Sequence, residues 1–259
     1  MNKTIISVCI ATYNGQKYIR QQIGSILAQL GENDEIVISD DNSSDDTLEI
    51  ISSLNDKRIK VFVNTGTHGV TGNFENAIKH ASGKYIFLSD QDDVWLPNKR
   101  ENFIQAFDSG ADVVLSDCYF TDSELNIAKG KSKFELFGVH TDFLRTLIRC
   151  DWQGSCMAFE SILRTKFLPI PKSKYILHDI WIGITIGTNS RLSILRTPTM
   201  LYRRHDNTVT PWGLGTAGEK IHSVNHLSFK LAKRFAIIYY YIRWMATKLC
   251  QRHKSTFFR

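Results

Sequence analysis

The chain has 259 residues, of which 42% are hydrophobic, and this is enough material for one large α/β domain. Its net charge is +6, but nine Lys or Arg and no acidic residue follow Glu219, so an acidic-leaning body precedes a basic tail. This asymmetry argues against a nucleic-acid-binding protein, and the five scattered cysteines, without metal spacing, predict reduced thiols in a cytoplasmic protein.

Apolar patterns in the first 120 residues alternate between strand and helix. β-Branched runs predict buried strands, and apolar residues spaced three or four apart predict helices. The predicted strands cover residues 4–12, 35–39, 58–64, 84–88 and 112–120. Helices are expected after Asn14-Gly15, after Ser43 and Ser44 as candidate N-caps, around Phe74 and from Pro97. This order predicts an α/β fold with a mostly parallel sheet covered by helices on both faces.

The pattern is looser after residue 120. We expect a mobile, partly helical insert over 123–150, a short strand over 152–159 and a helix over 161–167. A further helix starts at His178, and strand character returns over 191–202. The chain is thus divided into a first half (1–120) and a second half (121–215) of one domain, followed by a basic aromatic helical tail (216–259).

Acidic residues follow two of the predicted strands. Asp40 and Asp41 end the second strand, and Asp90, Asp92 and Asp93 end the central one. Ligands of parallel sheets bind outside the carboxyl ends of the strands, so these carboxylates are expected at one edge. Carboxylates this close repel one another unless a cation lies between them, and oxygen ligands suit Mg²⁺ or Mn²⁺. The alternative is a solvated acidic turn before Pro97, but acids from two separate strands favour a functional site.

The expected ligand is a nucleoside diphosphate held through a divalent metal. The sequence contains neither G-x-x-x-x-G-K-[ST] nor a G-x-G-x-x-G loop after a strand, which are the common phosphate-binding devices. Phosphate binding through Mg²⁺ or Mn²⁺ is therefore the simplest interpretation.

Three segments carry a resemblance to a known family. They are Ala11-Thr12-Tyr13-Asn14, the run from Ser39 to Asp45, and the run from Gly83 to Asp93. In order and spacing they resemble the family 2 glycosyltransferases with the GT-A fold. The Asp-Gln-Asp-Asp-Val-Trp form resembles the branch that builds bacterial O-antigens and capsules.

The resemblance implies roles for residues at the edge of the sheet. Asp92 would be the direct metal ligand, His205 would close over the diphosphate or metal, and Asp93 would contact the donor sugar. Nucleotide contacts are implied for Thr12, Asp40, Asp41, Asp90 and Gln91, with Asp90 contacting either the ribose or the metal. His205 is otherwise an ordinary surface histidine.

The resemblance implies that residues 1–120 bind the nucleotide sugar and that residues 121–215 hold the acceptor and the catalytic base. This second half resembles the family less closely. Asp179 is implied as the catalytic base, with His178 in place of the glutamate of the family's Glu-Asp pair. The alternative for Asp179 is a helix N-cap. Gly154 and Ser155 resemble the acceptor-side strand, and Trp181 could stack on the acceptor or belong to the core.

The implied activity is an inverting, metal-dependent hexosyl transfer. The donor would be UDP-glucose or UDP-galactose, with dTDP-rhamnose as the alternative, and the acceptor a sugar on diphospho-undecaprenol. Two rivals remain open. A nucleotidyltransferase would need a Gly-rich basic loop that Ala11–Lys17 lacks, and an inactive sugar-nucleotide-binding subunit would not need Asp92 and Asp179.

The tail from 226 to 259 mixes aromatic and aliphatic residues with basic ones. It is either an amphipathic helix that packs on the domain or an interfacial helix on an anionic membrane. The run Phe235–Ile242 is shorter than the ~20 residues of a membrane span. We therefore expect a cytoplasmic protein bound peripherally to the inner face of the membrane.

Overall fold

The computed structural model describes residues 5–148, 151–205 and 223–256. Its strands are β1 (Ile6–Thr12), β2 (Glu35–Asp40), β3 (Ile59–Val63), β4 (Tyr85–Asp90), β5 (Val94–Trp95), β6 (Val113–Thr121), β7 (Ile127–Ser132), β8 (Met157–Glu160) and β9 (Leu192–Arg203). The helices are α1 (Ile19–Leu27), α2 (Thr47–Ser53), α3 (Val70–His80), α4 (Lys99–Asp108), α5 (Lys133–Phe137), α6 (Phe143–Ile148), α7 (Arg164–Phe167), α8 (His178–Ile182) and α9 (Ser223–Thr256).

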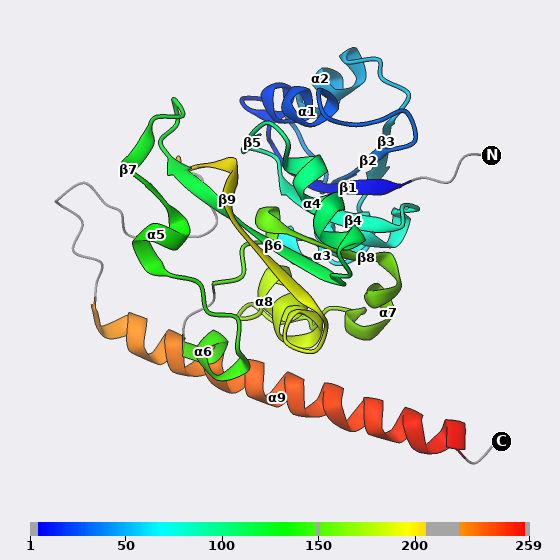
Figure 1. The fold of residues 1–259 in the computed structure, drawn as a ribbon, viewed down its shortest axis with the longest axis vertical. Helices are drawn as coiled ribbons and strands as arrows, with labels where there is room; N and C mark the ends of the chain where they lie inside the picture. The colour runs from blue at the N-terminus through cyan, green and yellow to red at the C-terminus, as the bar shows by residue number, and fades with distance from the viewer. Residues whose placement is uncertain (1–4, 149–150, 206–222, 257–259) are drawn as a thin grey trace.

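One sheet organises the domain (Figure 1). Its strand order is β3-β2-β1-β4-β8-β6-β9-β5, with β7 paired to β6. Strands β1 to β4, β6 and β9 run in one direction, whereas β5, β7 and β8 run against their neighbours. The predicted α/β fold with a mostly parallel sheet is confirmed.

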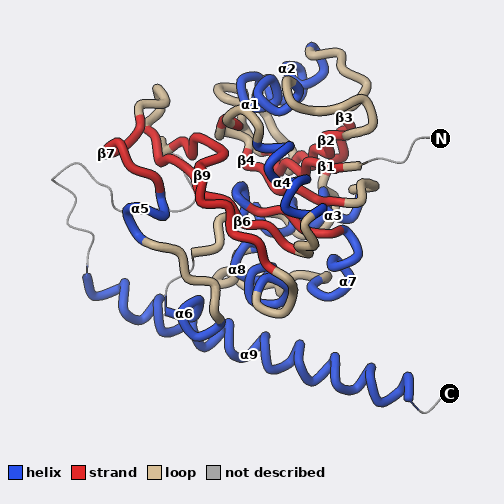
Figure 2. The backbone as a smooth tube through the Cα atoms, viewed as in Figure 1, coloured by secondary structure: helices blue, strands red, loops and turns tan. Residues whose placement is uncertain are grey.

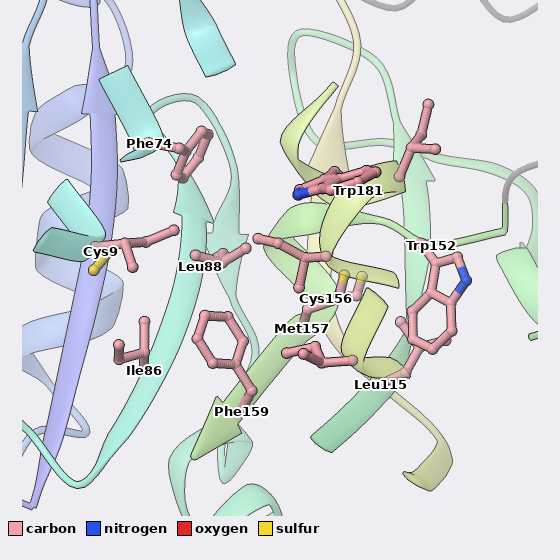
Figure 3. Close-up of a cluster of buried hydrophobic side chains, with 14 of the residues drawn as sticks. Cys9, Phe74, Ile86, Leu88, Leu115, Trp152, Cys156, Met157, Phe159 and Trp181 are labelled. Atoms are coloured by element: carbon pink, nitrogen blue, oxygen red, sulfur yellow. The ribbon is translucent and has the colours of Figure 1, made fainter. Parts of the chain in front are cut away.

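Helices cover both faces of the sheet because the strands are apolar on both sides (Figure 2). Along β1, Val8 and Ile10 pack in the cluster that contains Ile19 of α1, whereas Cys9 packs in the cluster that contains Phe74 of α3. Successive side chains of a strand point to opposite faces, so one short run supplies both cores. Figure 3 shows the cluster that contains Cys9 and Phe74, where Trp181 also lies among buried side chains.

The local predictions differ from the structure at four points. The strand expected over 152–159 begins only at Met157, after a short 3₁₀ helix over Gly154–Cys156. The expected insert over 123–150 contains strand β7 besides helices α5 and α6, and the two-residue strand β5 was not predicted. Ser43 and Ser44 do not cap α2, which begins at Thr47 after Asp46. Ser43 donates to Asp40 instead, so this serine closes the turn after β2 rather than starting a helix.

The tail forms the long helix α9, which lies along one side of the domain (Figure 1). One face packs against the body: Ile237 is buried, and the rings of Tyr241 and Phe143 are 4.5 Å apart. The indole N–H of Trp244 donates to the carbonyl of Lys166 (2.5 Å). The part of the tail before Ser223 lies outside the described residues, and the domain division at 120 and 215 stays a prediction.

Within the described ranges, no helix is both long enough and apolar enough to cross a bilayer.

Candidate active site

A cavity of about 650 Å³ opens at the carboxyl ends of β1, β2 and β4. This volume is typical of small-molecule sites. The predicted site residues that line it are Thr12, Asp41, Asp90, Gln91, Asp92, Gly154, Asp179 and His205. Segments far apart in the sequence therefore meet in one cavity, as the sequence analysis expected.

The predicted nucleotide contact of Asp40 is wrong, because this residue does not line the cavity and its side chain is buried. Its carboxylate accepts hydrogen bonds from the Thr12 hydroxyl (2.9 Å) and from the backbone N–H and hydroxyl of Ser43 (2.8 and 2.6 Å). These donors lie at the end of β1 and in the turn after β2. Asp40 therefore joins the strand ends and supports Thr12 from behind, rather than contacting a nucleotide.

Asp41 lies beside it on the cavity wall and holds the following loop. It accepts hydrogen bonds from Asn64 Nδ2 (2.8 Å), from His68 Nδ1 (2.8 Å) and from the backbone N–H of Gly69 (2.7 Å). Partial burial raises the pKa of Asp41, but these donors outweigh it, so the net shift is downward. An ionised carboxylate at this wall can accept hydrogen bonds from a ligand that carries N–H groups, such as a nucleobase.

Gln91 fixes the loop after β1. Its side-chain oxygen accepts from the backbone N–H of Tyr13, and its side-chain nitrogen donates to the carbonyl of Tyr13, both at 3.0 Å. A Cβ on Gly15 would lie 2.3 Å from the Gln91 oxygen, so an alanine there would push the Gln91 amide away from its bonds to Tyr13. Gln91 lines the cavity, and its observed bonds are to the protein backbone.

Asp90 and Asp92 bring two carboxylates together at the cavity wall. Burial, and then the charge of Asp92, raise the pKa of Asp90 to about 7. The Nε2 atom of His205 lies 2.8 Å from Asp92 Oδ2. These two residues are far apart in the sequence and meet at the cavity wall, and their role as metal ligands stays a prediction.

The predicted donor-sugar contact of Asp93 is also wrong, since this residue is fully buried and does not line the cavity. Its Oδ1 accepts from the backbone N–H of Arg203 (3.0 Å), and Oδ2 has no hydrogen-bond partner in the described part of the chain. Arg203 also donates to the carbonyl of Asp92 (2.8 Å). Asp93 therefore anchors the acidic turn to the end of β9, behind the position where a sugar would bind.

The carboxylate pair fits a divalent cation by its chemistry. Asp90 and Asp92 repel each other, and Asp92 and His205 present an oxygen and a nitrogen at one point of the wall. Among the described residues, no three His, Cys, Asp or Glu side chains converge as a complete metal site. A cation here would therefore complete its coordination with ligand oxygens and water, as Mg²⁺ does at phosphate sites.

Asp179 lies at the start of α8, on the cavity wall. Its Oδ1 accepts from the backbone N–H of Ile180 (2.7 Å), and Oδ2 has no hydrogen-bond partner among the residues described. Gly154 lies across from it, since a Cβ there would be 3.6 Å from the Cβ of Asp179. A partly exposed carboxylate with one unoccupied oxygen can accept a proton from a bound hydroxyl.

Ser155 and Trp181 were predicted to bind the acceptor, but neither lines the cavity. Ser155 is buried below the cavity wall, and its carbonyl accepts from the Lys99 ammonium (2.6 Å). Trp181 is 2% exposed, its indole N–H donates to the carbonyl of Phe167 (2.8 Å), and its ring packs in the core. Of the two alternatives for Trp181, the structure supports the core position.

Sequence reasoning missed two residues that support the site. Lys99 is 1% exposed beneath the acidic turn, and its position just after the Asp-rich run was a usable signal. The ring of Tyr18 lies between Arg203, 4.5 Å from the ring centre, and His205, at 4.8 Å between centroids. Tyr18 gave no sequence signal, because a tyrosine at a helix start is common in any fold.

A family model described as "Glycosyl transferase family 2" matches residues 7–168. Among curated relatives, the UDP-Glc:alpha-D-GlcNAc-diphosphoundecaprenol beta-1,3-glucosyltransferase WfgD of Escherichia coli is 37% identical over 101 residues. That alignment covers 39% of this chain and 40% of WfgD. The GalNAc(5)-diNAcBac-PP-undecaprenol beta-1,3-glucosyltransferase of Campylobacter jejuni is 35% identical over 127 residues, 48% of this chain and 41% of its own. The matched region thus spans about two fifths of these relatives.

Solved structures share the fold at low sequence identity. TarS residues 1–349 of S. aureus with UDP-GlcNAc superpose with a TM-score of 0.64 at 20% identity, covering 79% of this chain and 60% of TarS 1–349. The mannosyltransferase PcManGT of Pyrobaculum calidifontis, with GDP-Man and Mn²⁺, gives a TM-score of 0.54 at 17% identity, with 79% and 57% coverage. At these identities the likeness shows the fold.

Proposed function

Since this chain belongs to glycosyl transferase family 2 and is a glycosyltransferase, we propose that it transfers a hexose, with inversion, from a nucleotide sugar to a lipid-diphosphate-linked sugar. The observation that carries the proposal is a single cavity lined by Asp41, Asp92 and Asp179. These residues come from three separate segments, and each supplies a different function: nucleoside binding, diphosphate binding and proton transfer.

The nucleotide end is assigned to the wall formed by β1 and β2. Asp41 accepts donors of the nucleobase, and Thr12, whose hydroxyl is held by Asp40, shapes the wall beside it. The metal, Mn²⁺ or Mg²⁺, is assigned to Asp92 and His205. When bound there, it would offset the negative charge of the diphosphate.

Asp179 acts as the general base. It accepts the proton of the attacking acceptor hydroxyl, which approaches the face of the sugar opposite to the diphosphate. One displacement at the anomeric carbon breaks the bond to the diphosphate and forms the new glycosidic bond. Inversion follows because no enzyme carboxylate forms a covalent intermediate.

The relatives' names guide the choice of substrates. WfgD uses UDP-glucose and GlcNAc on diphosphoundecaprenol, so the first choice for this chain is the same donor and an N-acetylhexosamine acceptor. UDP-galactose is the closest alternative, and dTDP-rhamnose is the runner-up. These assignments fit a role in the synthesis of bacterial surface polysaccharide.

A panel of nucleotide sugars tests this proposal. UDP-glucose, UDP-galactose and dTDP-rhamnose are each incubated with Mn²⁺ and a synthetic alkyl diphosphate carrying N-acetylglucosamine, and release of the nucleoside diphosphate and the sugar product are followed. We expect acceptor-dependent turnover with one donor. Binding of a nucleotide sugar without turnover of any donor would favour the inactive binding subunit.

The outer face of α9 supports an anionic membrane as partner. A row of exposed apolar side chains runs along it at intervals of three and four residues: Leu231, Phe235, Ile238, Ile242 and Met245. Lys233 and Arg234 are partly exposed near the row, and the sequence after Glu219 lacks acidic residues. An apolar row with basic neighbours suits the interface of an anionic bilayer, where a lipid-linked acceptor is found.

Two variants with the same charge change test this face. Phe235, 69% exposed, lies on the row, and Thr247 is exposed elsewhere on the helix. F235E should lose co-sedimentation with vesicles that contain phosphatidylglycerol, whereas T247E should largely keep it. Equal binding by both variants contradicts membrane docking through the row. The alternative partner of this face is a second copy of the chain, and sedimentation velocity would detect the resulting dimer.

A further inference from the structure

His178, the residue before the proposed base, lies on the cavity wall between Gly154 and Asp179. Its side chain is 6% exposed, and its ring stacks on Phe74 of α3 with centroids 4.0 Å apart and planes at 25°. The stack packs one face of the imidazole against α3, at the start of α8.

Neither ring nitrogen of His178 has a hydrogen-bond partner in the described part of the chain, although both are buried. A buried polar group without a partner has lost its hydrogen bonds to water and gained nothing in return, so it lowers stability. A phenylalanine would stack on Phe74 without this cost. The imidazole therefore has a hydrogen-bonding capacity that the protein itself leaves unused.

The imidazole is neutral in this environment. Burial lowers the pKa of His178, and the nearby Asp179 carboxylate opposes this shift to a smaller extent. A neutral imidazole has one nitrogen that donates and one that accepts a hydrogen bond. A sugar hydroxyl, which also donates and accepts, complements either nitrogen, whereas the diphosphate end is assigned to Asp92 and His205.

Gly154 determines how a ligand can meet this ring. A Cβ at this position would lie 2.6 Å from His178 Nε2, closer than real Cβ atoms approach a nitrogen. Because glycine has no side chain, the Nε2 edge can turn toward the cavity past this point of the wall. An alanine here would block that edge.

From these contacts we infer that His178 is a specificity-determining residue that hydrogen-bonds a hydroxyl of the acceptor sugar. The hydroxyl would be next to the one that Asp179 deprotonates. The inference rests on the proposed function, because it takes the wall around Asp179 as the acceptor side. The ring turns its Nε2 edge past Gly154 as the sugar binds, and the sugar supplies the missing partner.

Two substitutions of His178 test the inference. H178F keeps the aromatic stack and removes both nitrogens, and H178Q keeps a donor and an acceptor. H178F should raise the acceptor KM at least tenfold without lowering the melting temperature. Its donor KM and its rate of nucleotide-sugar hydrolysis without acceptor should match those of the unmodified protein. H178Q should recover part of the acceptor affinity.

Acceptor analogues that each lack one non-reacting hydroxyl give a second measurement. The unmodified protein should discriminate against one analogue at least tenfold, and H178F should not discriminate, because the partner on the enzyme is already gone. An unchanged acceptor KM in H178F overturns the inference, and so does equal discrimination by both proteins. If H178F does not fold, H178Q and the analogue series on the unmodified protein decide: discrimination against no analogue rejects the inference.

The proposed function fails separately from this inference. Absence of turnover by the unmodified protein with every donor in the panel rejects the transferase assignment. Normal transfer by both the unmodified protein and H178F rejects the role of His178 and leaves the transferase assignment intact.

Discussion

The polar groups on the two walls of the cavity differ in how fully they are hydrogen-bonded. The nucleotide wall is formed at the ends of β1 and β2, and the base wall by Gly154, His178 and Asp179. On the nucleotide wall, Asp41 accepts three hydrogen bonds from the protein, and so does Asp40, which is buried behind that wall. On the base wall, Asp179 Oδ2 and both nitrogens of His178 have no hydrogen-bond partner among the described residues.

The difference indicates which wall is preorganised and which awaits a ligand. The satisfied network on the nucleotide wall holds the strand ends and the loop up to Gly69 in place before a ligand arrives. Under the proposed function, the unsatisfied atoms on the base wall would gain partners when the acceptor sugar binds. Substitutions on the two walls should therefore separate stability and donor binding from acceptor chemistry.

The largest expected effect is on the base wall. D179N keeps the shape of the side chain but cannot accept the proton, so the transfer rate should fall by about 10²–10⁴-fold. UDP binding, measured by calorimetry with Mn²⁺, should stay the same. D142N, on an exposed aspartate of the same half, is the matched control and should keep full activity. Normal turnover by D179N would show that another group is the base.

Removal of the proposed metal ligand should come next. D92A leaves His205 without its 2.8 Å partner and should lower the Mn²⁺-dependent affinity for UDP by at least about tenfold. Titrations of UDP with Mn²⁺ and with EDTA separate the metal-dependent part. If D92A and the unmodified protein bind UDP equally in Mn²⁺, the metal is bound elsewhere or is not needed.

The two walls also differed in how well their residues could be predicted from the sequence. The nucleotide wall is built from local motifs at strand ends, and parallel strands bring their carboxyl ends to one edge, so Asp41, Asp90 and Asp92 could be assigned together. The sequence did not distinguish Asp40 from Asp41. Consecutive residues of a strand point to opposite sides, and the register decides which one faces the cavity.

The supporting residues depended on contacts between distant segments. Arg203 reaches the carbonyl of Asp92, 111 residues away, and Lys99 reaches the carbonyl of Ser155, 56 residues away. No period or spacing encodes such contacts. Asp93 was misassigned for this reason, because its partner on β9 lies 110 residues along the chain.

A pair of neighbouring substitutions sharpens the assignment on the nucleotide wall. D40A leaves the buried Thr12 hydroxyl with only its longer bond to the Ser39 carbonyl (3.3 Å) and the partly buried Ser43 N–H without its acceptor, at a cost of about 3 kcal/mol. The melting temperature should fall by about 6–12 °C. D41A removes a cavity-facing acceptor whose partners can turn to water, so it should raise the KM for UDP-glucose more than it lowers the melting temperature.

Thermal denaturation and donor kinetics on both variants provide the check. The reverse pattern, in which D40A changes donor KM at unchanged stability, would return Asp40 to the nucleotide site. Asp45 offers a control at the same end of the sheet, since it also accepts from backbone N–H groups but does not line the cavity. D45A should leave donor KM unchanged.

The smallest effect concerns Trp181, which separates core from site on the base wall. W181F keeps an aromatic ring but removes the N–H that the Phe167 carbonyl accepts at 2.8 Å, at a cost of about 2 kcal/mol. The melting temperature should fall by about 4–8 °C, and the acceptor KM should not change. A raised acceptor KM at unchanged stability would mean that the indole reaches the sugar. The N–H bond to Phe167 and the 2% exposure of the ring argue for the first outcome, because a side chain held from behind in the core cannot also stack on a ligand in the cavity.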